Sequence, residues 1–144
     1  MNVFKRILAT IDIHDEVSSE KVVNAALELM SGDDILFVVC VVPDFGMSVV
    51  SGFFPKDYEQ DMLEKTRVEL HAFTEKHVPD GTPVQHIIAH GSIYEEILAA
   101  ANEVNADMIV VGSHRPALKD YLLGPNAARV VRHATQSVLV VRYN

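Results

Sequence analysis

The chain has 144 residues, of which 49% are hydrophobic and 22% are charged, the composition of a globular domain rather than of a disordered segment. Its formal net charge of −8 argues against a duplex-DNA partner, because DNA affinity comes mostly from Lys and Arg that neutralise phosphates. No segment approaches the roughly 20 apolar residues of a membrane span, and the single cysteine, Cys40, cannot form an intramolecular disulfide. We therefore expect one cytoplasmic domain over residues 1–144, with no nucleic-acid and no membrane partner.

The first half of the chain predicts, in order, a strand, a helix, a strand, a loop and a helix. These cover residues 4–12, 18–32, 34–42, 43–56 and 57–77. Ser18 or Ser19 is the candidate N-cap of the first helix and Gly32 is its stop, because a hydroxyl accepts from the free N–H groups of a first turn and glycine tolerates the conformation that ends a helix. The second strand, DILFVVCVV, is continuously apolar, which is typical of a strand buried on both faces of a parallel sheet.

The second half continues this alternation. The expected strands are TPVQHIIAH (82–90), ADMIVVG (106–112) and SVLVVRY (137–143), and the expected helices follow Gly91 and Gly124. Ser92 and Glu95 have the spacing of a capping box. With the right-handed crossover rule, this order predicts an α/β fold with an open, doubly wound, five-stranded parallel sheet and helices on both faces.

Ligands of such sheets bind outside the carboxyl ends of the strands, where the strand order reverses. Asp12, Val41 and Gly112 each stand at the end of a predicted strand, so they are the first candidates for a binding site.

A glycine-rich segment joins the fourth strand to the last helix. Gly112 at the strand end lets a ligand approach the backbone, and Gly124 precedes a helix whose free N–H groups favour an anion. Arg115 and Lys119 supply positive charge between the two glycines. The spacing is neither that of a P-loop nor that of a dinucleotide fingerprint. The residues alone leave a phosphate site and the simple ending of a strand and a helix as equal alternatives.

The stretch GSHRPALKDYLLGPNAARVVRHATQSVLVV, with RILATID at the start, FVVCVV in the second strand and HGSIYEEIL before the third helix, resembles the universal stress protein family. The resemblance covers almost the entire chain, and SHRP followed by LLG-x-N-A-A resembles a subgroup of the family. It implies a sheet in the order 3-2-1-4-5 and a protein that binds ATP, with or without Mg.

The glycine motif of the family's nucleotide-binding members maps its first glycine onto Gly112 and its third onto Gly124. The resemblance places Asp12 near the ribose and adenine, the Val41 backbone at the adenine edge, and Val111 beside the sugar. No catalytic and no metal-ligating residue is predicted. The candidate nucleotide-binding residues are Thr10, Asp12, Val41, Val111, Gly112, His114, Arg115, Gly124, Pro125, Asn126 and Ala127.

Three departures from the family motif concern the phosphate end. Arg115 stands in place of the second glycine, the interval to Gly124 is one residue short, and Pro125 stands where the family usually has Ser or Thr. Proline removes a hydroxyl and an N–H from the phosphate cradle, although it is well tolerated at the first position of a helix. We interpret Arg115 as compensation, because a guanidinium binds phosphate bidentately, and Asn126 as a second phosphate ligand.

Several neighbouring side chains have plainer interpretations. His14 and Asp15 are expected to be solvated loop residues, because no third ligand stands at metal spacing. Cys40 is expected to be a buried, inert thiol. Ser113 and His114 are adjacent in the chain and are not expected to act as nucleophile and base.

Three functions stay open at this point. The leading hypothesis is a cytoplasmic ATP-binding stress-response protein that acts by nucleotide-dependent conformational or assembly change. The alternatives are a slow ATPase or phosphoryl or nucleotidyl transferase that uses the same pocket, and a nucleotide-free dimeric scaffold. In the family's strand order the last strand lies at the sheet edge, which predicts a homodimer through residues 137–142, with Leu139 or its neighbours Val138 and Val140 at the centre.

Overall fold

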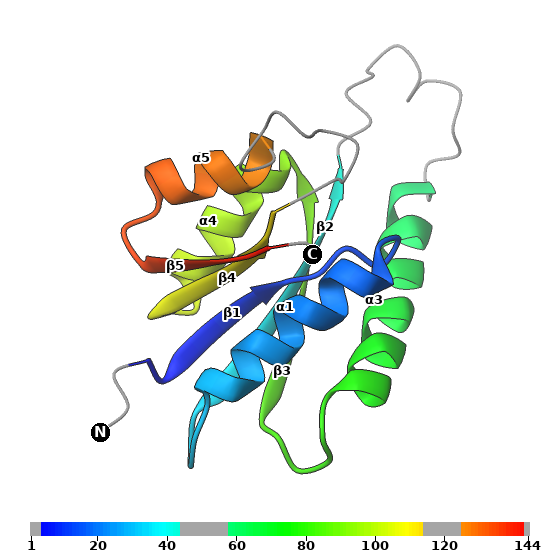
Figure 1. Cartoon of the computed structure of the whole chain (residues 1–144). Coiled ribbons are helices and arrows are strands. Elements are labelled where there is room, and N and C mark those ends of the chain that lie inside the picture. Colours follow the sequence, from blue (N-terminus) through cyan, green and yellow to red (C-terminus); the bar gives the residue numbers. More distant parts are fainter. Residues whose placement is uncertain (1–3, 44–57, 114–124, 143–144) are drawn as a thin grey trace.

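The computed structural model describes residues 4–43, 58–113 and 125–142. Its core is one five-stranded parallel sheet in the order β3-β2-β1-β4-β5 (Figure 1). This confirms the predicted fold class and strand order. The strands are β1 (Arg6–Thr10), β2 (Ile35–Pro43), β3 (Val84–Gly91), β4 (Met108–Gly112) and β5 (Ser137–Val141).

Two helices cover each face of the sheet (Figure 1). One face carries α1 (Glu16–Leu29) and α3 (Tyr58–His77), and the other carries α4 (Ile93–Glu103) and α5 (Pro125–His133). Neighbouring residues of β2 therefore enter different cores: Val38 packs with the α1 and α3 side chains and Phe37 with those of α4 and α5. Burial on both faces explains why this strand is continuously apolar.

The helix ends differ in part from the prediction. Asp15, not Ser18 or Ser19, is the N-cap of α1, and its carboxylate accepts the Ser18 N–H at 3.2 Å. The prediction was wrong because a carboxylate one turn earlier competes for the same free N–H groups. Ser92 does occupy the N-cap position of α4, but its side chain makes no capping hydrogen bond, so the predicted capping box is not formed.

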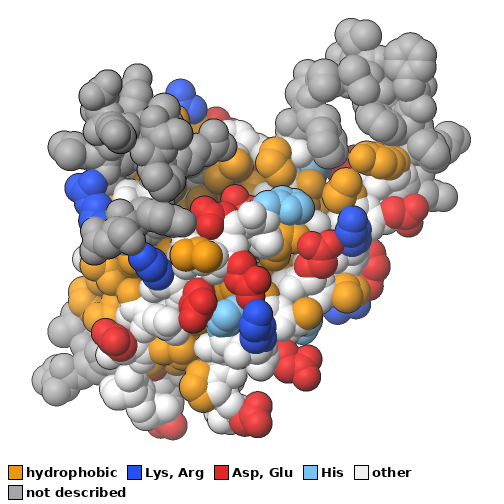
Figure 2. Space-filling model, turned by 45° about the vertical axis from the view of Figure 1, so that its right-hand side comes forward, with side chains coloured by type: hydrophobic (Ala, Val, Ile, Leu, Met, Phe, Trp, Pro, Cys, Tyr) orange, Lys and Arg blue, Asp and Glu red, His pale blue; other side chains and the backbone are white. Residues whose placement is uncertain are grey.

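The face covered by α1 and α3 is mainly acidic at its surface, as Figure 2 shows, with fewer Lys and Arg between the carboxylates. Glu16 of α1 accepts from Lys76 and meets the His77 ring of α3, both at 2.9 Å, and so links the two helices. These contacts hold the pKa of Glu16 below its ordinary value. None of the helices in the described ranges is long and apolar enough to span a membrane.

Candidate functional site

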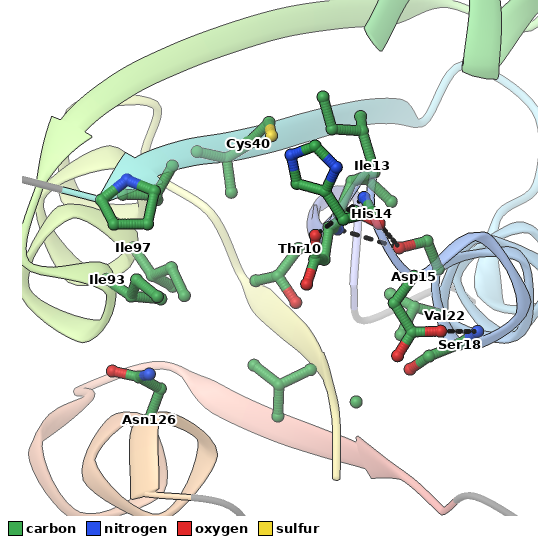
Figure 3. Close-up of a pocket in the computed structure, with 18 of the residues that line it drawn as sticks. Thr10, Ile13, His14, Asp15, Ser18, Val22, Cys40, Ile93, Ile97 and Asn126 are labelled. Atoms are coloured by element: carbon green, nitrogen blue, oxygen red, sulfur yellow. Dashed lines mark hydrogen bonds between the residues drawn. The ribbon is translucent and has the colours of Figure 1, made fainter. Parts of the chain in front are cut away.

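A cavity of about 790 Å³ opens at the carboxyl ends of β1, β2 and β4. The strand order reverses here, because β1 pairs with β2 on one side and with β4 on the other. Figure 3 shows side chains from the β1–α1 turn, β2, α4 and α5 around this space. Of the predicted residues, the lining contains Thr10, Asp12, Val41, Val111, Gly112, Pro125, Asn126 and Ala127.

The turn between β1 and α1 forms the polar wall of the cavity. Asp12 is exposed, and its Oδ1 accepts the His14 N–H at 2.9 Å, which folds the turn around the carboxylate. The backbone of Asp12 is bonded in turn by the buried Ser19 hydroxyl. Asp12 thus presents a carboxylate from a turn whose backbone is fixed.

The strand ends form the floor. The Thr10 hydroxyl donates to the Val110 carbonyl at 3.1 Å and ties β1 to β4. Val41 is half-buried at the cavity and Val111 is buried. Cys40 also lines the cavity, and burial raises the pKa of its thiol to about 11, which keeps it protonated and unreactive.

Gly112 has a role that the sequence did not reveal. A Cβ at this position would lie 2.9 Å from Ser18 Oγ and 3.4 Å from Val22 Cγ2, both on α1. The missing side chain therefore lets α1 approach β4 closely. This observation concerns the packing of α1, and the ligand contact of the Gly112 backbone stays a prediction.

The opposite wall comes from α4 and α5. Ile93 and Ile97 of α4 supply apolar surface, and Asn126 points from the first turn of α5 toward the same space (Figure 3). Pro125 is the first residue of α5, as predicted. Arg129, one turn further on, lies with its guanidinium carbon 5.1 Å from the centre of the Tyr94 ring.

The described lining is acidic rather than basic. Asp12, Asp15 and His14 are its ionisable groups besides Cys40, and within residues 4–43, 58–113 and 125–142 it contains no Lys or Arg. These carboxylates suit hydroxyl donors such as a sugar diol, whereas phosphate needs positive charge. The predicted residues His114, Arg115 and Gly124 lie outside the described residues. Across the described chain, no group of three His, Cys, Asp or Glu is arranged to hold a metal ion.

The structure adds lining residues that sequence reasoning missed. His14 and Asp15, predicted to be solvated loop residues, are exposed and half-buried respectively, and both also line the cavity. Their position directly after a strand end was the available signal. Met62 and Thr66 reach the cavity from α3, and no local pattern in the sequence indicated them.

Comparison with known proteins agrees with this geometry. The sequence model of the universal stress protein family matches residues 4–142. The chain belongs to this family. Universal stress protein G of Shigella flexneri is 28% identical over 141 residues, covering 96% of this chain and 99% of the relative. Universal stress protein MJ0577 of Methanocaldococcus jannaschii is 29% identical over 90 residues, which are 62% of this chain and 56% of the relative.

Solved structures show the same fold. The structure of MJ0577 superposes on this universal stress protein with a TM-score of 0.82 at 23% identity, covering 98% of this chain and 97% of the other. A family member from Burkholderia pseudomallei gives a TM-score of 0.70 at 26% identity, with 96% of both chains covered. A further family member, solved in complex with cAMP, gives a TM-score of 0.53 at 18% identity, with 98% of both chains covered.

Proposed function

We propose that this universal stress protein is a cytoplasmic ATP-binding protein of the stress response, which acts by nucleotide-dependent conformational or assembly change. The observation that carries the proposal is the cavity at the reversal point of a doubly wound parallel sheet, where nucleotides bind in such folds. The family relationship supports the choice of a nucleotide, and one structural neighbour is a cAMP complex.

The base and sugar occupy the described part of the cavity. The Asp12 carboxylate accepts the ribose hydroxyls, and the adenine lies against Val41 and the apolar surface of Ile93 and Ile97. Thr10 and Val111 complete the floor beneath the sugar. A cavity with apolar walls and a few polar groups is typical of a small-molecule site, and a purine nucleoside combines a flat apolar base with polar sugar hydroxyls that match it.

The phosphates extend toward the first turn of α5. Asn126 and the backbone at Ala127 lie there, and the helix dipole favours an anion at this end. The acidic described lining leaves the positive charge to Arg115 in the glycine-rich segment, where Gly124 allows close approach of the phosphates. Any Mg²⁺ bound with ATP would be held by the phosphate oxygens, which carry the negative charge.

Binding measurements with two ligands test this assignment. Asp12→Ala should weaken the binding of ATP and of adenosine alike. Arg115→Ala should weaken ATP binding by roughly 10- to 150-fold and adenosine binding hardly at all, since a charge-assisted contact contributes about 1.5 to 3 kcal/mol. Gly124→Asp should abolish ATP binding with a native circular dichroism spectrum. The control is Asp33→Ala, an exposed carboxylate in the α1–β2 connection.

Each outcome separates the candidate functions. Intact ATP recovered with the purified protein, detected by mass spectrometry, supports a binding protein, and conversion of ATP to ADP or a labelled product supports the slow enzyme. Wild-type protein that binds neither ligand at millimolar concentration would refute the proposal and favour the nucleotide-free scaffold.

We further propose a homodimer through β5. This strand is at one edge of the sheet, and a second copy related by a twofold axis would pair with its outer N–H and C=O groups. Its residues Val138 to Val141 are half-buried in the single chain, so pairing would cover apolar surface as well.

A further inference from the structure

The buried Ser19 hydroxyl is hydrogen-bonded to both the backbone N–H and the backbone carbonyl of Asp12. Ser19 is 2% exposed. Its Oγ accepts the Asp12 N–H at 2.8 Å and donates to the Asp12 carbonyl at 2.8 Å. A hydroxyl has one proton and two lone pairs, so it can make both bonds at once, whereas no apolar side chain can make either.

These two bonds replace the sheet ladder where β1 ends. The Ile11 N–H still donates to Val39 of β2, at 2.9 Å, whereas the next N–H along the chain, that of Asp12, is bonded by Ser19 instead. The Asp12 carbonyl also accepts the Asp15 N–H at 2.9 Å, within the turn. The position of this turn is thereby set by the first turn of α1.

The same helical turn is fixed against the neighbouring strand. Ser18 lies on Gly112 of β4 so closely that a Cβ on the glycine would be 2.9 Å from the Ser18 Oγ. The Asp15 carboxylate caps the helix, and the Ser19 N–H donates to the Asp15 carbonyl at 3.0 Å. Ser19 thus contacts the turn that follows β1, and the adjacent Ser18 contacts the last residue of β4, at two of the three strand ends that surround the cavity.

We propose that Ser19 is a positioning residue for nucleotide binding: it holds the Asp12 backbone so that the carboxylate meets the ribose. The inference rests on the proposed function, because it assigns Asp12 to the ligand. Without the hydroxyl, the Asp12 N–H loses the partner that the sheet no longer provides, and the turn gains alternative conformations in which the carboxylate is displaced. Ser19 is itself among the residues that line the cavity, but it is only 2% exposed and its one hydroxyl proton is donated to the Asp12 carbonyl, so it acts through Asp12 and not as a donor to the ligand.

A double-mutant cycle tests this mechanism. Calorimetric affinities for ATP are measured for wild type, Ser19→Ala, Asp12→Ala and the double variant. Ser19→Ala should lower the affinity for ATP by roughly 5- to 10-fold, the effect of one hydrogen bond. It should cause no further loss of affinity when Asp12 is already alanine. Thr74→Ala is the control and should keep wild-type affinity for ATP. It removes another buried hydroxyl, which lies away from the cavity, donates to the His71 carbonyl at 3.1 Å and lies 2.7 Å from His86 Nε2.

A second measurement needs no ligand. Amide exchange of the nucleotide-free protein should show faster exchange of the Asp12 N–H in Ser19→Ala, with the β2 amides unchanged. If Ser19→Ala does not fold, Ser19→Cys is measured in its place, because a thiol fills the same space but forms only weak hydrogen bonds. Ser19→Cys should likewise weaken ATP binding and speed the exchange of the Asp12 N–H.

The outcomes are distinct. Unchanged ATP affinity in Ser19→Ala, or losses that add in the double variant, would overturn the positioning role, the second by showing that Ser19 acts independently of Asp12. If wild-type protein binds no ATP, the proposed function fails and the positioning role fails with it, while the exchange of the Asp12 amide still reports whether Ser19 fixes the turn. Unchanged exchange with a native fold would refute the inference at its structural basis.

Discussion

Substitution of Val140 by proline should weaken the proposed dimer without disrupting the fold of the single chain. The reason is that the backbone N–H of Val140 points away from the sheet. The Ser113 N–H donates to the Val141 carbonyl at 2.9 Å, so Val141 faces β4 with its backbone groups. These groups alternate from one side of a strand to the other with each residue, so the N–H of Val140 points to the open edge. Proline is tolerated at such a position. Val140→Pro should therefore keep the sheet and remove a donor from the dimer contact.

The size of the effect follows from the symmetry. In an antiparallel pair centred on Val140, this residue faces its own copy and the two exchange both backbone hydrogen bonds. Proline in both copies removes these two bonds, each contributing about 0.5 to 1.5 kcal/mol. The dimer should weaken by about 1 to 3 kcal/mol, which corresponds to roughly 5- to 150-fold in dissociation constant.

Sedimentation equilibrium over a micromolar concentration range measures this constant directly. Val140→Ala keeps every backbone donor and should stay dimeric. Leu139→Pro is the opposite control: its N–H points to β4, so proline there should lower the melting temperature of the chain itself. A monomeric wild type, or a proline variant that dimerises as tightly as wild type, would show that this strand is not the interface.

Three further predictions concern the cavity and the α3–β3 contact. Gly112→Ala should lower the free energy of unfolding in urea by about 1 to 3 kcal/mol, because the added Cβ would lie 2.9 Å from Ser18 Oγ. Ser18→Ala in the same chain should restore most of this stability, and no rescue would mean that another contact is responsible. Cys40, with a pKa of about 11 against an ordinary 9.0, should react with iodoacetamide at pH 8 about a hundredfold more slowly than a free thiol, and ATP should slow it further; fast labelling of folded protein would contradict this. Burial and the stacked His71 ring lower the pKa of His86, so the unfolded chain binds a proton at His86 more readily than the folded chain, and the free energy of unfolding should fall as the pH drops below about 6.5. His86→Gln should flatten this pH dependence, and equal slopes in wild type and variant would refute the prediction.

The sequence by itself determined the architecture because the relevant signals are local. A continuously apolar second strand requires cover on both faces, and that cover comes from the helices between the strands. Strand ends marked by Asp12 and Gly112 then located the cavity, since all carboxyl ends of a parallel sheet lie at one edge. The strand order came from the family resemblance, because periodicity does not state which strands are neighbours.

Only the tertiary structure decided which side chains serve that cavity. The sequence offered Ser18 and Ser19 as equivalent caps, whereas the structure uses Asp15 as the cap, turns Ser19 to the end of β1 and places Ser18 on β4. Met62 reaches the cavity from a helix whose pattern shows only an apolar stripe. These roles depend on the angle and depth at which each helix lies on the sheet. Packing between residues distant in the chain sets that geometry, and local sequence patterns do not encode it.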